Sequence, residues 1–387
     1  MGIRRIGTAL ALLGMGGVAV TVAGPAAAAP AVTIGWHVDP GAAQGGTGAV
    51  NVAGTRGRLT IAAHRSYALA YPPPTTVRAA VTRIDGVVVA DRPAGASVEV
   101  AVRGRYRAGW SAWQRLPARL AEPTTGVQVR LTLHAGTGGA PVVRDVAMTG
   151  VSGRGQSRIA AAAEYRVYAT REGLVGGTTA NGHVVASHDH FVSLPSWSAL
   201  SPKGTGDYSV RACTGGRCAY EPVWDVGPWN THDDYWNVAR EQWRDLPPGM
   251  PEAQAAVQRG YNGGLDQYGR RVLNPAGIDL ADGTVWDDLR LTDDNRWVTV
   301  TYLWFVGTRG RVETEGSPLN VRGGPGTGYP SVGMAARYAR VPVECQATGE
   351  PITGAAGTSR LWDRIGPGNY VSHAYVVMDA GVAAPRC

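Results

Sequence analysis

Residues 98–103 read VEVAVR and residues 127–133 read VQVRLTL. In both stretches an apolar residue alternates with a polar or small one, which is the period of a β-strand with one buried face. Similar runs, separated by glycine and proline turns, extend from about residue 34 to residue 151. We therefore expect residues 30–153 to form a β-sandwich that serves as an accessory domain.

The composition of the whole chain is that of a mostly β protein. It has 54 Gly and 25 Pro, and its 12 Trp and 15 Tyr far outnumber its 2 Phe. Such a composition favours short strands joined by turns. A length of 387 residues is too great for one hydrophobic core and predicts two or three domains.

The formal net charge of +7 does not indicate a nucleic-acid partner. Nucleic-acid binding would gather basic residues among aromatic ones, whereas here they are scattered. A mild basic excess would help retention on the anionic polymers of a cell envelope.

The first residues read as an export signal. Arg4 and Arg5 precede an apolar stretch over 6–22, and small residues follow at 24–29. We expect a signal peptide over residues 1–29 and a secreted mature chain, extracellular or associated with the cell wall. Since no later run is long and apolar enough to span a bilayer, we expect no membrane span after signal cleavage.

The four cysteines all lie in the second half of the chain. An even number in an exported protein favours disulfides, and four cysteines allow three pairings. The short spacer TGGR between Cys213 and Cys218 favours that pair, which leaves Cys345 with Cys387. Neither pair has the spacing of a zinc site, so we expect no metal.

Residues 160–306 have a mixed pattern, and residues 317–387 return to short strands with dense glycine. The first of these segments contains the best helix signal in the chain, PEAQAAVQR at 251–259, with proline at its start and glycine after its end. A polar linker, SGRGQS at 152–157, separates it from the N-terminal module.

Residues 317–329, SPLNVRGGPGTGY, strongly resemble the opening of bacterial SH3-like domains. Gly323 replaces the serine usual in that pattern, and WDRIG at 362–366 and YVS at 370–372 fit the later strands. The resemblance implies a small SH3-like β-barrel over 317–387. Domains of this kind often bind cell-wall peptides, although a spacer without a ligand is the alternative.

Four short stretches in residues 160–306 resemble, in the same order, motifs of double-psi β-barrels. They are GGTTANGH at 176–183, HDHFVSLPS at 188–196, WDVGP at 224–228 and GIDL at 277–280. That group includes rare-lipoprotein-A-type lytic transglycosylases, expansins and certain secreted protease inhibitors. The resemblance implies a double-psi β-barrel, here with a long helix-containing insertion. Val226 stands where the family has an arginine.

By this resemblance Asp225 falls on the position proposed as the catalytic carboxylate in the lytic members, with His190 its neighbour. Asp279 is a third catalytic candidate. Cleavage of a glycosidic bond needs a partly desolvated acid that protonates the leaving oxygen. The candidates for glycan binding are the aromatic residues near Asp225 and one asparagine: Trp224, Trp229, Tyr235, Trp236 and Asn181.

Structural roles compete with each of these assignments. Asp225 before Gly-Pro suits a turn, Asp279 suits a strand end or a helix cap, and the tryptophans suit a core. Joint metal ligation by residues 188–190 is disfavoured because adjacent strand residues point to opposite faces.

Three functions remain open. The favoured one is a secreted monomer that binds peptidoglycan or another cell-wall glycan or peptide. The alternatives are a lytic-transglycosylase-like enzyme that uses Asp225 and His190, and a secreted protease inhibitor. No G-x-S-x-G, H-E-x-x-H or other hydrolase motif is present, and no motif implies a cofactor.

Overall fold

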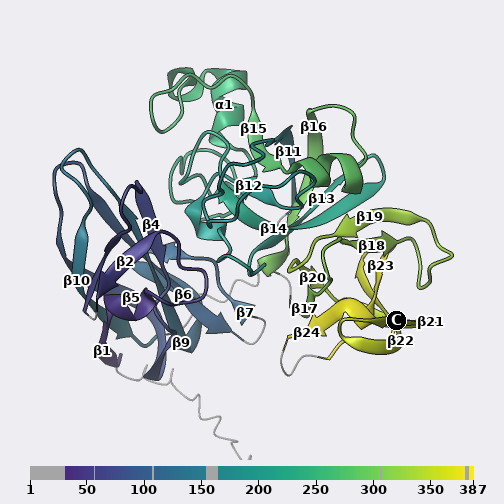
Figure 1. Ribbon diagram of the computed structural model, residues 1–387, viewed down its shortest axis with the longest axis horizontal. Coiled ribbons are helices and arrows are strands. Elements are labelled where there is room, and N and C mark those ends of the chain that lie inside the picture. Colours follow the sequence, from purple (N-terminus) through teal and green to yellow (C-terminus); the bar gives the residue numbers. More distant parts are fainter. Residues whose placement is uncertain (1–30, 56, 107–108, 154–163, 306, 380–382) are drawn as a thin grey trace, which may run out of the picture. The chain divides into compact units, whose positions relative to one another are not determined.

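Strands dominate the part of the chain that the structure describes, which confirms the predicted mostly β class (Figure 1). The structure is a computed structural model, and it describes residues 31–55, 57–106, 109–153, 164–305, 307–379 and 383–387. The predicted signal peptide over 1–29 and residues 154–157 of the predicted linker lie outside these ranges. Within them, no helix has the length and apolar character needed to cross a membrane.

The N-terminal module is built from ten strands and a short 3-10 helix, η1 (Pro40–Ala43). The strands are β1 (Thr33–Val38), β2 (Val52–Thr55), β3 (Arg58–Ile61), β4 (Tyr67–Ala70), β5 (Thr75–Asp91), β6 (Ser97–Tyr106), β7 (Gly109–Trp110), β8 (Gln114–Arg115), β9 (Ala118–His134) and β10 (Val142–Val151). They form one hydrogen-bonded sheet whose main path is β2-β3-β10-β5-β9-β6-β7.

The sheet surrounds one apolar core. Its two longest strands, β5 and β9, pair with each other and connect the remaining strands. β5 pairs with β10 and with β9, and its register on β9 shifts twice between Thr76 and Arg83. Such irregularities bend a strand and increase its twist. The buried alternating residues of β9 (Val127, Val129, Leu131 and Leu133) join the core, as the sequence pattern predicts.

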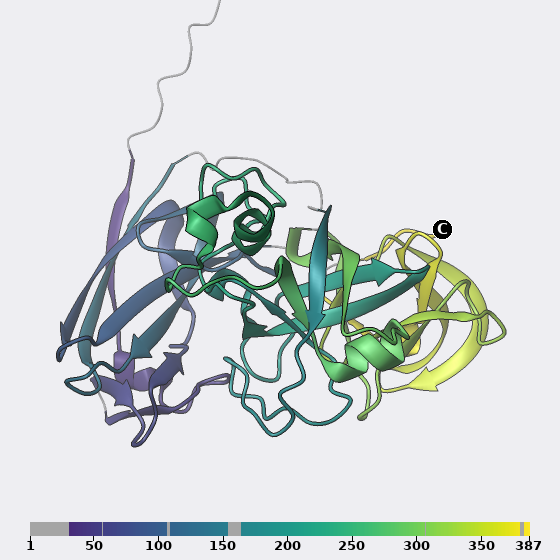
Figure 2. The same cartoon turned by 90° about the horizontal axis from the view of Figure 1, so that it is seen from above.

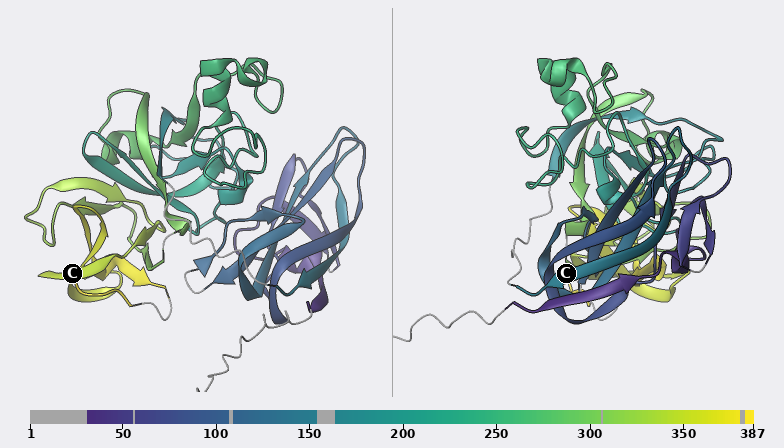
Figure 3. Two further views of the ribbon diagram at one scale, coloured as in Figure 1. Left: turned by 180° about the vertical axis from the view of Figure 1, so that it is seen from behind. Right: turned by 90° about the vertical axis from the view of Figure 1, so that its left-hand side faces the viewer.

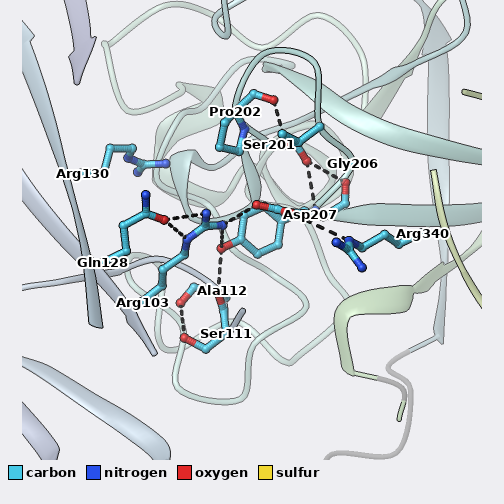
Figure 4. A network of polar contacts seen from close by, with 12 residues as sticks. Arg103, Ser111, Ala112, Gln128, Arg130, Ser201, Pro202, Gly206, Asp207 and Arg340 are labelled. Atoms are coloured by element: carbon cyan, nitrogen blue, oxygen red, sulfur yellow. Dashed lines mark hydrogen bonds and ion pairs between the residues drawn. The ribbon is translucent and has the colours of Figure 1, made fainter. Parts of the chain in front are cut away.

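Part of the opposite, polar face of this sheet, on β6 and β9, is buried as well. Arg103 on β6 and Arg130 on β9 are each 3% exposed. Arg103 Nη1 lies 2.8 Å from an Asp207 carboxylate oxygen, and Arg130 Nη1 donates to the Trp197 carbonyl at 2.7 Å. Figure 4 shows Asp207 between Arg103 and Arg340. Contacts with the central module therefore cover a face that the period-two pattern assigns to solvent.

Six strands of the central module form a closed ring. They are β11 (Glu164–Arg171), β12 (Val192–Leu194), β13 (Ser209–Thr214), β14 (Arg217–Val226), β15 (Ala276–Leu280) and β16 (Asn295–Tyr302). Their order is β12-β15-β11-β16-β13-β14, and β14 pairs back with β12. The β11–β15 and β12–β14 pairs are parallel and the others are antiparallel. Val167, Leu194, Val210, Ile278 and Val300 are among the buried residues of its core.

The predicted helix of the central module is present as α1 (Glu252–Arg259) (Figure 2). Pro251 precedes it, and Gly260 ends it with a left-handed φ of 64°, a conformation that favours glycine. Helices of one or two turns complete the module: η2 (Trp197–Ala199), η3 (Tyr261–Gly264), the π-helical η4 (Thr284–Asp288) and η5 (Leu303–Phe305). α1 packs beside β15, where Gly277 faces Pro251.

The C-terminal strands extend the sheet of the barrel (Figure 3). They are β17 (Arg309–Val312), β18 (Leu319–Arg322), β19 (Ser331–Ala335), β20 (Arg340–Pro342), β21 (Cys345–Gly354), β22 (Gly357–Gly366), β23 (Asn369–Ser372) and β24 (Val376–Met378), with η6 (His373–Tyr375). β19 runs parallel to β14 over Cys218–Tyr220, and β20-β17-β24 form a separate small sheet. The segment thus has a small core, to which Tyr220 of β14 and Leu303 of η5 also contribute, and it shares a sheet with the barrel.

Both predicted disulfides are confirmed. Cys213 and Cys218 join the facing ends of β13 and β14, with their Cα atoms 4.1 Å apart. Cys345 at the start of β21 is bonded to Cys387, with a Cα separation of 5.0 Å. Two disulfides are compatible with an extracellular protein.

Candidate functional site

A row of polar residues crosses four neighbouring strands of the central barrel. Strand register places Ser193 on β12 opposite Asp225 on β14 and opposite Asp279 on β15, and Asp279 opposite Thr170 on β11. Paired residues of neighbouring strands present their side chains to the same face of a sheet. A β-bulge between the Val192 and Ser193 pairs breaks the alternation along β14, and bulges re-aim side chains in this way. Asp225 and Asp279, two predicted catalytic residues, therefore belong to one site.

A third carboxyl group, that of Glu172, completes the cluster. Glu172 follows β11 directly, and its Oε2 accepts a hydrogen bond of 2.5 Å from the Ser193 hydroxyl. Burial, then the charge of Asp225 and a hydrogen bond with that carboxylate, raise the pKa of Glu172 well above its usual range. Glu172 therefore keeps its proton at neutral pH.

The other two carboxylates are held by the surrounding backbone and side chains. Burial raises the pKa of Asp279 to about 7, to which the charge of Asp225 also contributes, while a hydrogen bond from the Thr170 hydroxyl opposes the rise. Asp225 Oδ1 accepts a hydrogen bond of 2.6 Å from the main-chain N–H of Ala180. The cluster can thus both donate and accept protons near neutral pH, which is what acid–base catalysis requires.

His190 does not join this cluster. Its Nδ1 lies 3.1 Å from Asp288 Oδ2, and it lies beside Glu221 on β14. Asp225 lies four positions after Glu221, which amounts to about 13 Å along a strand. The predicted pairing of His190 with Asp225 is not formed.

The predicted glycan-stacking aromatic residues are largely occupied by packing inside the protein. Tyr235 is 0% exposed and Trp236 is 2% exposed, and both pack against Tyr302 in the core. Trp224 stacks on Phe191 with ring centroids 5.8 Å apart. Burial leaves Tyr235 and Trp236 no ring face for a sugar, so they belong to the core alternative.

The two remaining glycan-binding candidates are also tied to neighbouring residues. Trp229 donates its indole N–H to the Asn274 side-chain oxygen at 2.9 Å. Asn181 is 0% exposed, and its amide bonds to the Ser201 carbonyl and to the main chain at His183. Asn181 therefore shapes the 176–183 loop, whose Ala180 N–H holds Asp225.

An open hollow of about 420 Å³ lies next to this loop. Its lining residues include Thr178 and Gly182 of the loop, Tyr67 of β4, and the basic residues Arg65 and Lys203. The Tyr67 hydroxyl donates to the Ala180 carbonyl at 3.2 Å. Burial, and then the charge of Asp225, raise the pKa of Tyr67. The hollow therefore lies within electrostatic reach of the carboxyl cluster.

Sequence reasoning missed Glu172, Ser193 and Thr170. Glu172 belongs to none of the four motifs, and Ser193 lies inside one of them without a role. The available signal was its position, because Glu172 comes directly after YRVYATR at 165–171, a stretch rich in residues typical of strands, and Gly173 follows it. Only the strand register shows that this strand end faces Asp225.

The fold and site together define a disulfide-bonded, mostly β protein with a carboxyl cluster on a six-stranded barrel. A family profile described as a domain of unknown function (DUF8814) matches residues 163–301, the segment that forms this barrel.

The uncharacterized protein YraI of Bacillus subtilis (strain 168) is 34% identical over 84 residues, which are 19% of this chain and 70% of YraI. The chain therefore belongs to the family of YraI. YraJ, an uncharacterized protein of the same organism, is 46% identical over 52 residues, which are 13% of this chain and 44% of YraJ. The chain thus spans less than half of YraJ. No solved structure matches the chain.

Proposed function

We propose that this chain is a secreted protein that acts on bacterial cell-wall glycan, and that the carboxyl cluster of its barrel cleaves a glycosidic bond. One observation carries the proposal: Glu172, Asp225 and Asp279 meet at one site, where the pKa values of Glu172 and Asp279 are raised. A neutral carboxyl group beside a carboxylate is the arrangement that protonates a leaving oxygen.

The proposed chemistry uses the proton that Glu172 holds at neutral pH. This proton passes to the glycosidic oxygen as the bond from that oxygen to the anomeric carbon breaks. The carboxylate left behind then takes a proton from the attacking hydroxyl group, which belongs either to water or to the sugar itself. One carboxyl group thus acts first as acid and then as base. Asp279 stabilises positive charge that develops on the sugar.

Three further features support a role at the cell wall. The segment 317–329 resembles bacterial SH3-like domains, and two disulfides suit an oxidising exterior. The ring order of β11–β16, with its two parallel pairs, suits the double-psi barrel that the motifs suggest. Peptidoglycan is therefore the substrate that the first assay should use.

Glycan binding without cleavage is the second candidate. The hydrogen bonds that the cluster already makes favour it, because Thr170, Ala180 and Ser193 each donate to one of the carboxyl groups. A cluster satisfied in this way can hold sugar hydroxyls without reacting.

The test is incubation of the secreted chain with purified peptidoglycan, followed by mass spectrometry of the soluble fraction. The comparison variants are Glu172→Gln and Asp225→Asn, with Asp293→Asn as a matched control, since Asp293 is a 60% exposed carboxylate of the same module. We expect muropeptides from the wild type and the control, and at least a 100-fold loss in the two site variants. Anhydro ends would identify transglycosylation and reducing ends hydrolysis.

Sedimentation of the protein with peptidoglycan, without release of soluble fragments, would contradict the enzyme and support the binder. Release that persists in both site variants would place the chemistry elsewhere. An absence of both binding and release would reject peptidoglycan as the ligand.

A further inference from the structure

A second cluster of titratable side chains lies further back along β14, away from Asp225. It consists of Glu221 on β14, His190 just before β12, and Asp288 at the end of η4. One donor atom from each of these residues lies within 4.8 Å of the others. The glycan-directed chemistry proposed above uses none of the three.

The carboxyl groups of this cluster are fully buried and incompletely bonded. Glu221 and Asp288 are both 0% exposed. In the described part of the chain, no donor group other than a protonated partner carboxyl reaches either oxygen of Glu221, and the same holds for Oδ1 of Asp288. Glu221 pairs across the sheet with Val210, a residue of the barrel core. Two carboxyl groups are therefore aimed at one point in an apolar setting, which is costly unless a cation or a proton joins them.

Among the residues that the structure describes, neither the Glu221 nor the Asp288 carboxyl group forms an ion pair with an arginine or a lysine. Arg217 lies beside Asp288, but its Nε donates to the main-chain oxygen of Asp288, at 2.7 Å, and its Nη1 to that of Ser331, while its Nη2 is buried without a partner in the described ranges. His188 bonds to Asp287 at 2.7 Å, and Asp287 lies 4.0 Å from His190 Nε2 at the rim. Asp287 adds negative charge.

We propose that His190, Glu221 and Asp288 bind a single divalent transition-metal ion, Zn²⁺ or Mn²⁺. One imidazole nitrogen and two carboxylate oxygens suit these ions, whereas Ca²⁺ and Mg²⁺ prefer oxygen ligands alone. Ligands at about 2.0–2.2 Å from one ion lie at most about 4.4 Å apart, so the site needs only a small contraction.

The place of Asp288 in the fold agrees with a metal ligand. It ends η4, a π-helical turn over Thr284–Asp288, and such turns are frequent at functional sites. An ion there would tie η4 to β14 and to the segment before β12, so we assign it a structural role in holding one end of the barrel. Of residues 188–190, only His190 belongs to the proposed metal ligands. The site therefore does not need two adjacent residues of an extended segment to point at the same ion.

The test uses the full secreted chain, freed of metal with EDTA and then dialysed against ZnCl₂, MnCl₂, CaCl₂ or MgCl₂. Bound metal is counted by mass spectrometry, and affinity is measured by titration calorimetry. We expect one Zn²⁺ or Mn²⁺ per chain and no tight binding of Ca²⁺ or Mg²⁺. Glu221→Gln and Asp288→Asn keep the shape of each side chain, and each should weaken binding at least 100-fold. The control is Asp145→Asn, because Asp145 forms an exposed pair with His37 at 3.0 Å.

A shared proton between Glu221 and Asp288 is the competing way to neutralise the pair. In that case the wild type binds no ion with a one-to-one stoichiometry, and zinc does not raise its melting temperature. Either of those results would overturn the proposal, as would equal affinity in Glu221→Gln and the wild type. The melting comparison uses wild-type protein alone, so it decides the matter even when a variant does not fold.

Discussion

Replacing Asp279 by Asn should stabilise the folded protein above neutral pH and leave its stability almost unchanged near pH 4. Burial, assisted by the charge of Asp225, raises the pKa of Asp279 to about 7 from an ordinary value of 3.8. The folded state therefore holds a proton on Asp279 more tightly than the unfolded state does. It follows that wild-type stability falls as the pH rises from about 4 to about 7. Asn has no proton to lose, so the variant escapes this fall.

The size of the effect follows from the shift in pKa. Each unit of difference between the folded and unfolded pKa is worth about 1.4 kcal/mol. Partial contact of the Asp279 carboxyl with water weakens the effect, so we expect a gain of about 2–4 kcal/mol at pH 8. For a cooperative unit of the size of Val32–Cys387, this corresponds to a rise in Tm of about 3–6 °C.

The assay is thermal unfolding of wild type and Asp279→Asn at pH 4, 6 and 8, with Asp293→Asn as the exposed control. Asn retains the oxygen that accepts the hydrogen bond from Thr170, so the substitution changes charge and proton binding with little change of shape. A Tm difference that grows with pH supports the proposed electrostatics of the site. A uniform loss of Tm at all three pH values would refute it and make Asp279 a structural anchor.

Two further predictions concern stability away from the site. Asp207→Asn removes the carboxylate that lies 2.8 Å from the buried guanidinium of Arg103 (Figure 4). Unfolding in urea should show that the free energy of unfolding falls by about 3–5 kcal/mol. The control, Asp91→Asn, removes one partner of an exposed ion pair and should cost almost nothing. Burial alone would raise the pKa of Asp207, but the guanidinium groups of Arg103, Arg340 and Arg309 together outweigh it and lower that pKa. This stabilisation should therefore disappear as the pH falls below about 4. Replacing both cysteines of the 345–387 bridge by serine should cost about 4 kcal/mol, and of the 213–218 bridge about 2 kcal/mol, because the first closes the longer loop. Equal losses in the two double variants would contradict the loop-entropy explanation.

Local sequence was a good guide wherever neighbouring residues decide the structure. α1 was predicted because Pro251 and Gly260 bound it, and both residues act through their own backbone geometry. The 213–218 bridge was predicted because a short glycine-containing spacer lets the chain turn back on itself. The alternation over 127–133 correctly identified which side of β9 faces the apolar core, since β-strand side chains point alternately to opposite faces.

Local sequence was a poor guide wherever distant strands decide which side chains meet. His190 was expected beside Asp225, but a difference of four positions along β14 directs it to Glu221 and Asp288 instead. Tyr235 and Trp236 resemble a sugar platform in sequence, yet the ring of strands places them against Tyr302. An aromatic residue has the same local signature in a core as in a binding groove.

The sequence by itself determined the mostly β class, the helix and the disulfide pairing, because each depends on side-chain periodicity or on residues close together in the chain. Only the tertiary structure decided the membership of the carboxyl cluster. Asp225 lies on β14, Asp279 lies on β15 and Glu172 directly follows β11. These segments are far apart in sequence, and the register of β11, β12, β14 and β15 brings them together. A shift of one residue in any of these pairings would turn a carboxyl group to the other face of the sheet.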